Sequence, residues 1–439
     1  MKPVTVIGGG PAGRFAAMHL ASAGREVRLV EPRSIGGQCL LHGCMLVNAL
    51  NDAARAVANA RRLVSLGALD GCPTVDFRGL LDATAAIQRT IMGVLEKETR
   101  DTGVDILGGV SASFDGRQAL IDGTPVESDA VVIATGSRPA LPDLPGIDKA
   151  GVFTAANLAT MRSLPERLVV IGGGVQAVEF AYAFATFGSQ VDLVVRSELL
   201  RRMDPLVTRL ARKELHRVAI HESTQVVSID GSTSVEGVTV GPAGEERFLP
   251  ADAVLCAVGL RANSEECHGV QKRKNGTIVV NDRMQTSIPG VYACGDVIGP
   301  PYLTPVAREE GRVAARNILG EEVHLDLRAV PQGFSLGNQF SWYHDGSTSS
   351  SLTMPGPAGP DSFFAVPEGG TGAAKVFFTG DRRVAGVVSV APAASLPVMY
   401  LAELIRQGLP LDGLDDLLEI HPTADGLHVL IRYLASRRD

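Results

Sequence analysis

The chain has 439 residues, of which 45% are hydrophobic and 20% are charged, and its formal net charge is -7. This length is typical of about three domains, and the negative charge argues against a nucleic-acid partner. No apolar run reaches the roughly 18 residues of a membrane-spanning helix, so we expect no membrane partner, and we see no secretory signal. Six cysteines are too few for a disulfide framework, so we expect a cytoplasmic protein in which a disulfide would be catalytic.

The first residues follow the pattern of a dinucleotide-binding unit. An apolar run over 2–7 leads into Gly8-Gly9-Gly10-Pro11-Ala12-Gly13, a predicted helix over 14–23, and a predicted strand over 26–30 that ends at Glu31. Gly8 permits a tight turn, Gly10 lets a pyrophosphate approach the backbone, and Gly13 lets helix and strand pack closely. The carboxylate of Glu31 is suited to bind the ribose hydroxyls of an adenosine.

Two cysteines stand five residues apart in Gly37-Gln38-Cys39-Leu40-Leu41-His42-Gly43-Cys44, directly before a predicted helix over 45–64. The N-terminus of that helix favours a thiolate. A regular helix would hold the two Cα atoms ~8.7 Å apart, beyond the roughly 4.4–6.8 Å of a disulfide. We therefore expect an irregular turn, which Gly43 would permit. Two interpretations stay open at this point: a redox pair, or two buried and inert cysteines.

The next segment contains a predicted helix and three short predicted strands. The helix covers 76–103, and the strands cover 104–107, 118–121 and 130–133, the last of which leads into Ala134-Thr135-Gly136. Proline and glycine then recur over 139–151, which we interpret as a domain boundary.

Residues 167–195 repeat the opening pattern, with Gly172 and Gly174 in the glycine motif and Ala177 in the place of its third glycine. Arg196 stands where the first copy has Glu31. A guanidinium there suits a 2′-phosphate, which a carboxylate would repel, and Arg201 and Arg202 add positive charge nearby. We therefore expect the second unit to prefer NADPH. The alternative is that Arg196 is a solvated strand end.

The remaining segments carry weaker signals. Hairpins are predicted over 225–249, a strand over 253–258 that leads to Gly259, a strand that ends at Asp296, a loop over 300–307 and a helix over 308–319. Beyond residue 325, the composition predicts a flexible loop over 345–360, strands over 375–378 and 384–390, and helices over 395–407 and 427–436, with His421 between these helices.

Taken together, these motifs resemble those of the FAD-dependent pyridine nucleotide–disulfide oxidoreductases, the family of dihydrolipoamide dehydrogenase, glutathione reductase and mercuric reductase. The resemblance rests on both glycine motifs, the two-cysteine stretch, residues 134–136 and Ala293-Cys294-Gly295-Asp296. It implies an α/β fold of two Rossmann-like dinucleotide-binding domains, one for FAD (1–145 and 266–322) and one for NADPH (146–265). A C-terminal α+β dimerisation domain (323–439) would follow them.

The resemblance also implies roles for single residues. Cys44 would face the flavin as the charge-transfer thiolate, and Cys39 would exchange with the substrate. His421 would reach into the active site of the partner subunit in a homodimer, and Asp296 would hold the ribityl end of FAD. The other positions implied are Glu179 as a catalytic residue and, for the cofactors, Gly8, Gly10, Gly13, Glu31, Gly37, Gln38, Ala134, Thr135, Gly136, Val306, Gly172, Gly174, Ala177, Arg196, Arg202 and Gly259.

The chain departs from the family pattern in several places. Relatives carry a lysine at the position of Val47 or Asn48 that pairs with the glutamate at 179, and an aromatic residue often stands at Val175. Relatives also read His-Pro-Thr-x-x-Glu, whereas this chain has Gly426 in the sixth position and Asp425 one residue early, which turns it by ~100° around a helix. The C-terminus lacks the cysteine pair of mercuric reductases, which argues against mercury reduction.

We therefore expect an NADPH-dependent FAD enzyme that reduces a small-molecule or protein disulfide through Cys39 and Cys44. One alternative is a flavin-dependent reductase or carboxylating relative that lacks the usual His–Glu dyad and uses another acceptor, such as a quinone, a metal or a coenzyme M thioether. The other is a flavoprotein whose cysteine state regulates a partner.

Overall fold

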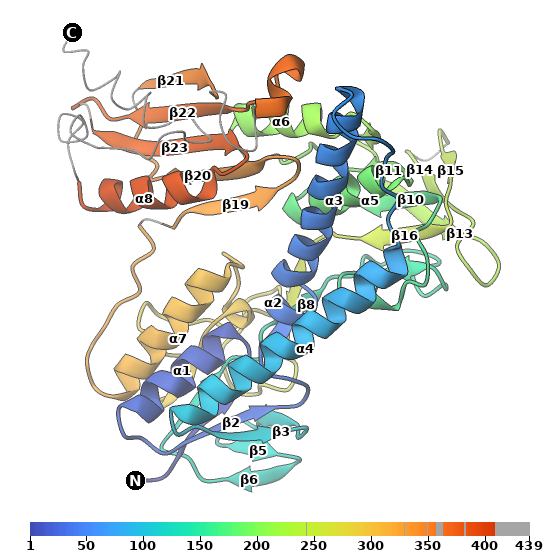
Figure 1. Ribbon diagram of the computed structural model, residues 1–439. Helices are drawn as coiled ribbons and strands as arrows, with labels where there is room; N and C mark the ends of the chain where they lie inside the picture. Colours follow the sequence, from blue (N-terminus) through green and yellow to red (C-terminus); the bar gives the residue numbers. More distant parts are fainter. Residues whose placement is uncertain (243, 329, 349, 357–362, 382, 409–439) are drawn as a thin grey trace.

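The structure has three main sheets, of which two are five-stranded and parallel and the third is a five-stranded antiparallel sheet that follows them in the chain (Figure 1). The computed structural model describes residues 1–408 apart from 243, 329, 349, 357–362 and 382. This arrangement confirms the predicted α/β class with two Rossmann-like units and a further α+β unit.

The first parallel sheet has the strand order β18-β7-β1-β2-β3. Its strands are β1 (Val4–Ile7), β2 (Val27–Glu31), β3 (Asp105–Gly108), β7 (Ala130–Ile133) and β18 (Val291–Ala293). Every residue of β1 and β7 is buried, as expected for central parallel strands that are covered on both faces. Helix α1 (Pro11–Ser22) joins β1 to β2, which confirms the strand–helix–strand pattern of the opening unit.

The second parallel sheet has the order β12-β11-β10-β16-β9. Its strands are β9 (Val152–Phe153), β10 (Arg167–Ile171), β11 (Gln190–Val194), β12 (Val218–His221) and β16 (Ala253–Cys256). Helix α5 (Val175–Phe187) joins β10 to β11. The adjacent strands β11-β10-β16 repeat the arrangement β2-β1-β7 of the first sheet, which confirms the internal repeat.

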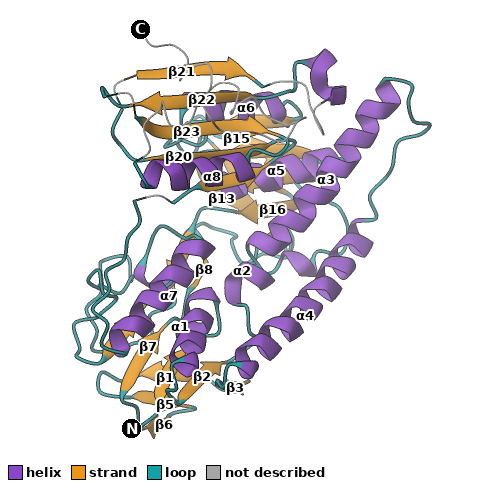
Figure 2. Cartoon of the chain, turned by 60° about the vertical axis from the view of Figure 1, so that its left-hand side comes forward, coloured by secondary structure: helices purple, strands orange, loops and turns teal. Residues whose placement is uncertain are grey.

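The helices α3 (Cys44–Ser65) and α4 (Phe77–Asp101) confirm the two long helical segments that the sequence predicted. Both extend from the first sheet toward the second (Figure 2). Leu46 and Leu50 of α3 share one apolar core with Phe180 and Phe184 of α5 and with Phe340 of the antiparallel sheet. Helix α3 therefore ties the three parts of the structure together.

The antiparallel sheet has the order β19-β20-β23-β22-β21. It consists of β19 (Gln332–Ser335), β20 (Gln339–His344), β21 (Ser350–Pro355), β22 (Ala373–Phe378) and β23 (Val384–Ala391), and α8 (Ser395–Arg406) packs against it. The loop predicted over 345–360 is wrong in part, because β21 lies within it. This edge strand is held by backbone pairing with β22 while most of its side chains are exposed, so it lacks the alternating pattern of a half-buried strand.

Smaller elements complete the described part of the chain, and the predicted hairpins over 225–249 are confirmed. They are α2 (Gly37–Leu41), β4 (Ala112–Phe114), β5 (Ala119–Ile121), β6 (Thr124–Val126), β8 (Ser137–Pro139), α6 (Pro205–Glu214), β13 (Val226–Asp230), β14 (Gly237–Val240), β15 (Arg247–Pro250), β17 (Leu260–Ala262), α7 (Thr304–Ile318) and the short 3₁₀ helices η1 (Leu158–Thr160), η2 (Asp296–Ile298) and η3 (Phe363–Glu368). In the described residues, every helix is too short or too polar to cross a membrane. His421, Asp425, Gly426 and the helix predicted over 427–436 lie outside the described residues.

Helices α1 and α7 pack closely against each other over the first sheet (Figure 1). Gly311 of α7 permits this contact, because a Cβ atom at that position would lie 2.1 Å from the carbonyl oxygen of Ala12. A side chain there would force the two helices apart.

We expect Gly311→Ala to destabilise the protein by about 1–3 kcal/mol, the usual cost of overpacking. The matched control is Gly93→Ala on α4, where a Cβ atom would meet nothing within 4 Å and where alanine should stabilise the helix by about 0.5–1 kcal/mol. Thermal melting of the two variants measures the difference. A Gly311→Ala variant that melts no lower than the wild type would contradict the close-packing argument.

Candidate active site at the paired cysteines

A cleft of about 1550 Å³ is lined by residues that follow the carboxyl ends of the central strands in both parallel sheets. Ligands of open α/β sheets bind at this edge. The predicted residues that line the cleft are Gly8, Gly10, Glu31, Gly37, Gln38, Cys39, Cys44, Ala134, Thr135, Gly136, Gly174, Glu179, Gly259 and Asp296. The fold therefore brings these residues, which come from distant parts of the chain, into one cleft.

The other predicted positions do not line the cleft in the described part of the chain. Val306 and Ala177 are buried in the core, and Gly13 and Gly172 support the glycine turns from behind. Arg196 and Arg202 are exposed on the segment that follows β11.

The first glycine loop has the geometry that its motif predicted. Gly8 has a φ of +109°, and a Cβ atom there would lie 2.3 Å from the carbonyl oxygen of Ala134. At Gly13 a Cβ atom would lie 1.9 Å from the oxygen of Gly8, whereas at Gly10 the nearest atom would be 3.9 Å away. The backbone of Gly10 is thus open to a phosphate at the N-terminus of α1.

Two carboxylates also line the cleft, Glu31 at the end of β2 and Asp296 after β18. Glu31 accepts hydrogen bonds from the backbone N–H of Gly9 (2.7 Å) and of Arg33 (2.9 Å), and both carboxylate oxygens keep a lone pair for a ribose hydroxyl. Asp296 accepts a hydrogen bond from Ser137 Oγ (2.6 Å), and burial raises its pKa. The open loop and the two carboxylates fit the pyrophosphate, ribose and ribityl groups of FAD.

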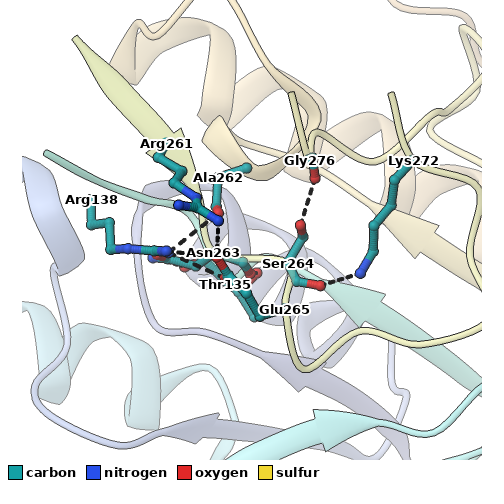
Figure 3. A network of polar contacts seen from close by, with 9 residues as sticks. All are labelled: Thr135, Arg138, Arg261, Ala262, Asn263, Ser264, Glu265, Lys272 and Gly276. Atoms are coloured by element: carbon teal, nitrogen blue, oxygen red, sulfur yellow. Dashed lines mark hydrogen bonds and ion pairs between the residues drawn. The ribbon is translucent and has the colours of Figure 1, made fainter. Parts of the chain in front are cut away.

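The segment Ala134-Thr135-Gly136 lies directly before β8, which pairs with β17. Hydrogen bonds to Asn263, which follows β17, hold the segment in place (Figure 3). Thr135 Oγ1 donates to the carbonyl oxygen of Asn263 (2.5 Å), and Asn263 Nδ2 donates to the carbonyl oxygen of Thr135 (3.0 Å). Arg138 pairs with Glu265 (2.6 Å) and thereby lowers the pKa of Glu265 to about 2. The hydroxyl of Thr135 is therefore used in a hydrogen bond within the protein, and we expect this segment to contact a cofactor through its backbone.

The second glycine loop repeats the first. A Cβ atom at Gly172 would lie 2.3 Å from the oxygen of Ala257, whereas one at Gly174 would meet nothing within 4 Å. Arg196, Arg201 and Arg202 lie just after β11, are exposed and have no ion-pair partner among the described residues. Three free guanidinium groups near the open end of α5 fit the phosphates of a pyridine dinucleotide.

The two cysteines lie on either side of a break between α2 and α3, which ends α2 at Leu41 and starts α3 at Cys44. The expected irregular turn is confirmed, and Gly43 lies in it directly before α3. A Cβ atom at Gly43 would lie 3.1 Å from the oxygen of Gln38 and 3.3 Å from Cys39 Cα. Glycine is thus favoured by the close approach of the two helices.

The start of α7 places Thr304 against the first cysteine. Thr304 Oγ1 donates a hydrogen bond to Cys39 Sγ at 3.1 Å. The loop predicted over 300–307 is wrong at its end, because α7 begins at Thr304 and not at Arg308. Pro305 in the first turn was the available signal, since proline is favoured there.

The two thiols are hydrogen-bonded to each other, and this contact shifts their pKa values in opposite directions. The hydrogen bond from Cys44 lowers the pKa of Cys39 to about 6, aided by Thr304 and by the positive charge of Arg308. The same contact and burial raise the pKa of Cys44. The resemblance implies the thiolate at Cys44, but the hydrogen bonds of this structure favour it at Cys39.

Glu179 lies on α5, is 8% exposed, and has an amide in place of the lysine of the family pattern. Its Oε1 atom accepts from Asn51 Nδ2 (3.4 Å) and from the backbone N–H of Ser335 (3.1 Å). Asn51 stands one helical turn after Val47, so the same face of α3 supplies a neutral donor. Asn51 was not among the residues predicted from the sequence, although its four-residue spacing from Val47 was visible there.

Burial raises the pKa of Glu179 to about 7, against the opposing effects of the Ser335 N–H and of the Arg55 charge. Asn51 Oδ1 is buried without a hydrogen-bond partner in the described part of the chain. The structure thus holds a carboxyl group that changes charge near neutral pH beside the cleft.

Glu179→Gln should change how stability depends on pH. The folded state keeps the Glu179 proton up to a pKa of about 7, whereas the unfolded state releases it near 4.5. The wild type therefore gains stability from this group at low pH and loses it as pH rises from about 4.5 through 7. Relative to wild type, the glutamine variant should gain on the order of 3 kcal/mol over that range. Unfolding midpoints of both proteins measured across the range test this, and parallel curves would contradict it.

Within the described residues, no three side chains of His, Cys, Asp or Glu gather as a set that could hold a metal ion. His42 lines the cleft beside the cysteines, and burial together with the charge of Arg33 lowers its pKa. The cleft thus brings together a thiol pair, a buried acid and two glycine loops.

Comparison with known proteins agrees with this geometry. Residues 2–311 match the family described as pyridine nucleotide-disulphide oxidoreductase. Dihydrolipoyl dehydrogenase of Acholeplasma laidlawii is 31% identical over 325 residues, which cover 72% of this chain and 96% of that protein. Mercuric reductase of Shigella flexneri is 31% identical over an alignment of 454 residues, which covers 94% of this chain and 77% of that protein.

A solved structure shares the whole fold. The HOCl-induced flavoprotein disulfide reductase RclA from Escherichia coli superposes with a TM-score of 0.85 at 23% identity, covering 100% of both chains. The matched family model, the relatives and the site geometry agree, and the chain belongs to the pyridine nucleotide–disulphide oxidoreductase family.

Proposed function

We propose that this protein is an NADPH-dependent flavoprotein that reduces a disulfide substrate through Cys39 and Cys44. Family membership makes it an oxidoreductase that uses FAD and a pyridine nucleotide. The observation that carries the finer proposal is the thiol pair at the cleft, with Cys39 stabilised as an anion by Cys44 and Thr304.

The two glycine loops support a division of labour between the cofactors. We assign residues 1–145 and 266–322 to FAD and 146–265 to NADPH, with Gly10, Glu31 and Asp296 as the principal FAD contacts. Bound FAD would relay two electrons from the nicotinamide to the cysteine pair. The chain itself positions the pair and sets which sulfur is charged.

The exchange then follows from the charge of the two sulfurs. The Cys39 thiolate attacks one sulfur of the substrate, a bond to Cys39 forms, and the substrate S–S bond breaks to release the first thiol. Cys44 gives up its proton and attacks the Cys39 sulfur, which releases the second thiol. The pair is left as a disulfide and two electrons have passed to the substrate. Of the two protons that the leaving thiolates take up, one comes from Cys44 and the other from solvent.

We also propose that the protein is a homodimer built on the C-terminal unit, residues 323–439. Relatives in this family are commonly homodimers, and α8 exposes an apolar face of Leu396 (70%), Met399 (55%) and Tyr400 (47%). The role of His421 in the partner's active site remains part of this proposal, since that residue lies outside the described residues.

Cys39→Ser tests the proposed function. We expect NADPH-driven reduction of disulfides to fall by more than about 100-fold, because the attacking sulfur is lost, while NADPH-driven reduction of a non-thiol dye persists. The control is Cys72→Ser, since Cys72 is an exposed cysteine outside the cleft. Unchanged disulfide turnover in Cys39→Ser would overturn the proposal and direct attention to a quinone or metal acceptor. Turnover below about 1 s⁻¹ with every oxidant would instead favour a regulatory role.

Arg196→Ala tests the coenzyme preference. We expect kcat/KM to fall roughly 10- to 100-fold for NADPH, the worth of a charged hydrogen bond, and to stay unchanged for NADH. The control is Arg167→Ala. Arg167 begins β10, which is parallel to β11, so it lies at the opposite edge of the sheet from Arg196, and it pairs with Asp252 (2.6 Å). An unchanged ratio of NADPH to NADH efficiency would show that Arg196 is only a solvated strand end.

A further inference from the structure

Two residues on successive turns of helix α7 act on Cys39. Thr304 donates its hydrogen bond to the sulfur, and Arg308 follows four residues later. The charge of Arg308 acts on Cys39 and also on Arg14 of α1, so the guanidinium lies within electrostatic range of both. Arg308 does not itself line the cleft described above, but its neighbours Pro305 and Ala307 do.

Arg308 is held in place by an aromatic ring. Its Cζ atom lies 5.2 Å from the centroid of the Phe15 ring on α1, a cation–π distance. Such stacking limits the motion of the planar guanidinium while leaving its edge donors available. The close packing of α1 and α7 thus holds a positive charge whose field acts on the reactive sulfur.

The guanidinium of Arg308 has no carboxylate or other hydrogen-bond partner among the described residues. The other arginines of α7 are neutralised, Arg312 by Glu309 (2.6 Å) and Arg316 by Glu321 (2.6 Å). Arg14 on α1 is likewise paired with Glu98 (3.3 Å). In a chain of net charge -7, an exposed and unpaired arginine beside a thiolate is a distinctive feature.

We propose that Arg308 binds a carboxylate of the disulfide substrate, so that the protein prefers disulfides that carry negative charge close to the S–S bond. This inference rests on the proposed function. The Cys39 anion repels an anionic substrate, and Arg308 offsets that repulsion while orienting the substrate sulfur toward Cys39. Thr304 already supplies the hydrogen bond that the thiolate needs, which leaves the donors of Arg308 for the substrate.

The test uses the full-length, FAD-loaded protein and three small disulfides of similar size. They are dithiodipropionate with two carboxylates, hydroxyethyl disulfide without charge, and cystamine with two ammonium groups. The wild type should show the highest kcat/KM for dithiodipropionate and the lowest for cystamine. Arg308→Gln should lower the value for dithiodipropionate roughly 10- to 100-fold and leave that for hydroxyethyl disulfide within about 3-fold.

Two further variants separate charge from structure. Arg308→Lys should restore part of the preference, because it returns the charge without the bidentate fork. Arg316→Gln serves as the matched control on the same helix and should behave as the wild type. The rate at which iodoacetamide, a neutral reagent, alkylates Cys39 at each pH reports the pKa of Cys39 independently of substrate charge.

Equal losses for all three disulfides in Arg308→Gln, with a matching rise in the pKa of Cys39, would overturn the inference, since Arg308 would then serve the thiolate alone. A wild type that reduces all three disulfides equally would also overturn it. If the wild type reduces none of them but still reduces a dye with NADPH, the proposed function fails and this inference falls with it.

Discussion

The hydrogen bond from Thr304 to Cys39 is the contact on which the arrangement of this site depends. It joins two residues that are 265 positions apart, and it requires three conditions of the fold. Helix α2 must end before Gly43, α7 must begin at Thr304, and α1 must lie against α7 closely enough for Gly311 to face Ala12. The charge of one sulfur thus depends on how α1, α2 and α7 pack against one another.

Glu179 shows how the chain manages without the cation of the family pattern. A buried ion pair needs both charges, and one carboxylate left alone in an apolar region favours its protonated form. Asn51 gives Glu179 a neutral donor in place of that cation. The site therefore replaces a fixed charge with a carboxyl group that titrates near pH 7, which makes its electrostatics depend on pH where the family's ion pair would not.

The sequence predicted both nucleotide-binding units because the first glycine of each motif has no substitute, as Gly8 shows by its positive φ and by its contact with Ala134. It failed where tertiary contacts decide. Strand β21 is held by backbone pairing with few buried side chains, so its residues show no period. Thr304, Arg308 and Asn51 acquire their roles only through partners far away in the chain. The sequence alone can therefore predict helix α7 but not its contact with Cys39.

The positive charge of Arg308 and the hydroxyl of Thr304 act on Cys39 in physically different ways. A hydrogen bond at 3.1 Å is a short-range contact that salt leaves intact, whereas the field of an exposed guanidinium is screened over about 10 Å at ordinary ionic strength. Formation of the thiolate should therefore be nearly independent of salt, while attraction of an anionic substrate should weaken as salt rises. Attraction of the substrate by Arg308 therefore acts mainly on the rate of association and on substrate specificity. The disulfide exchange itself depends on the two sulfurs.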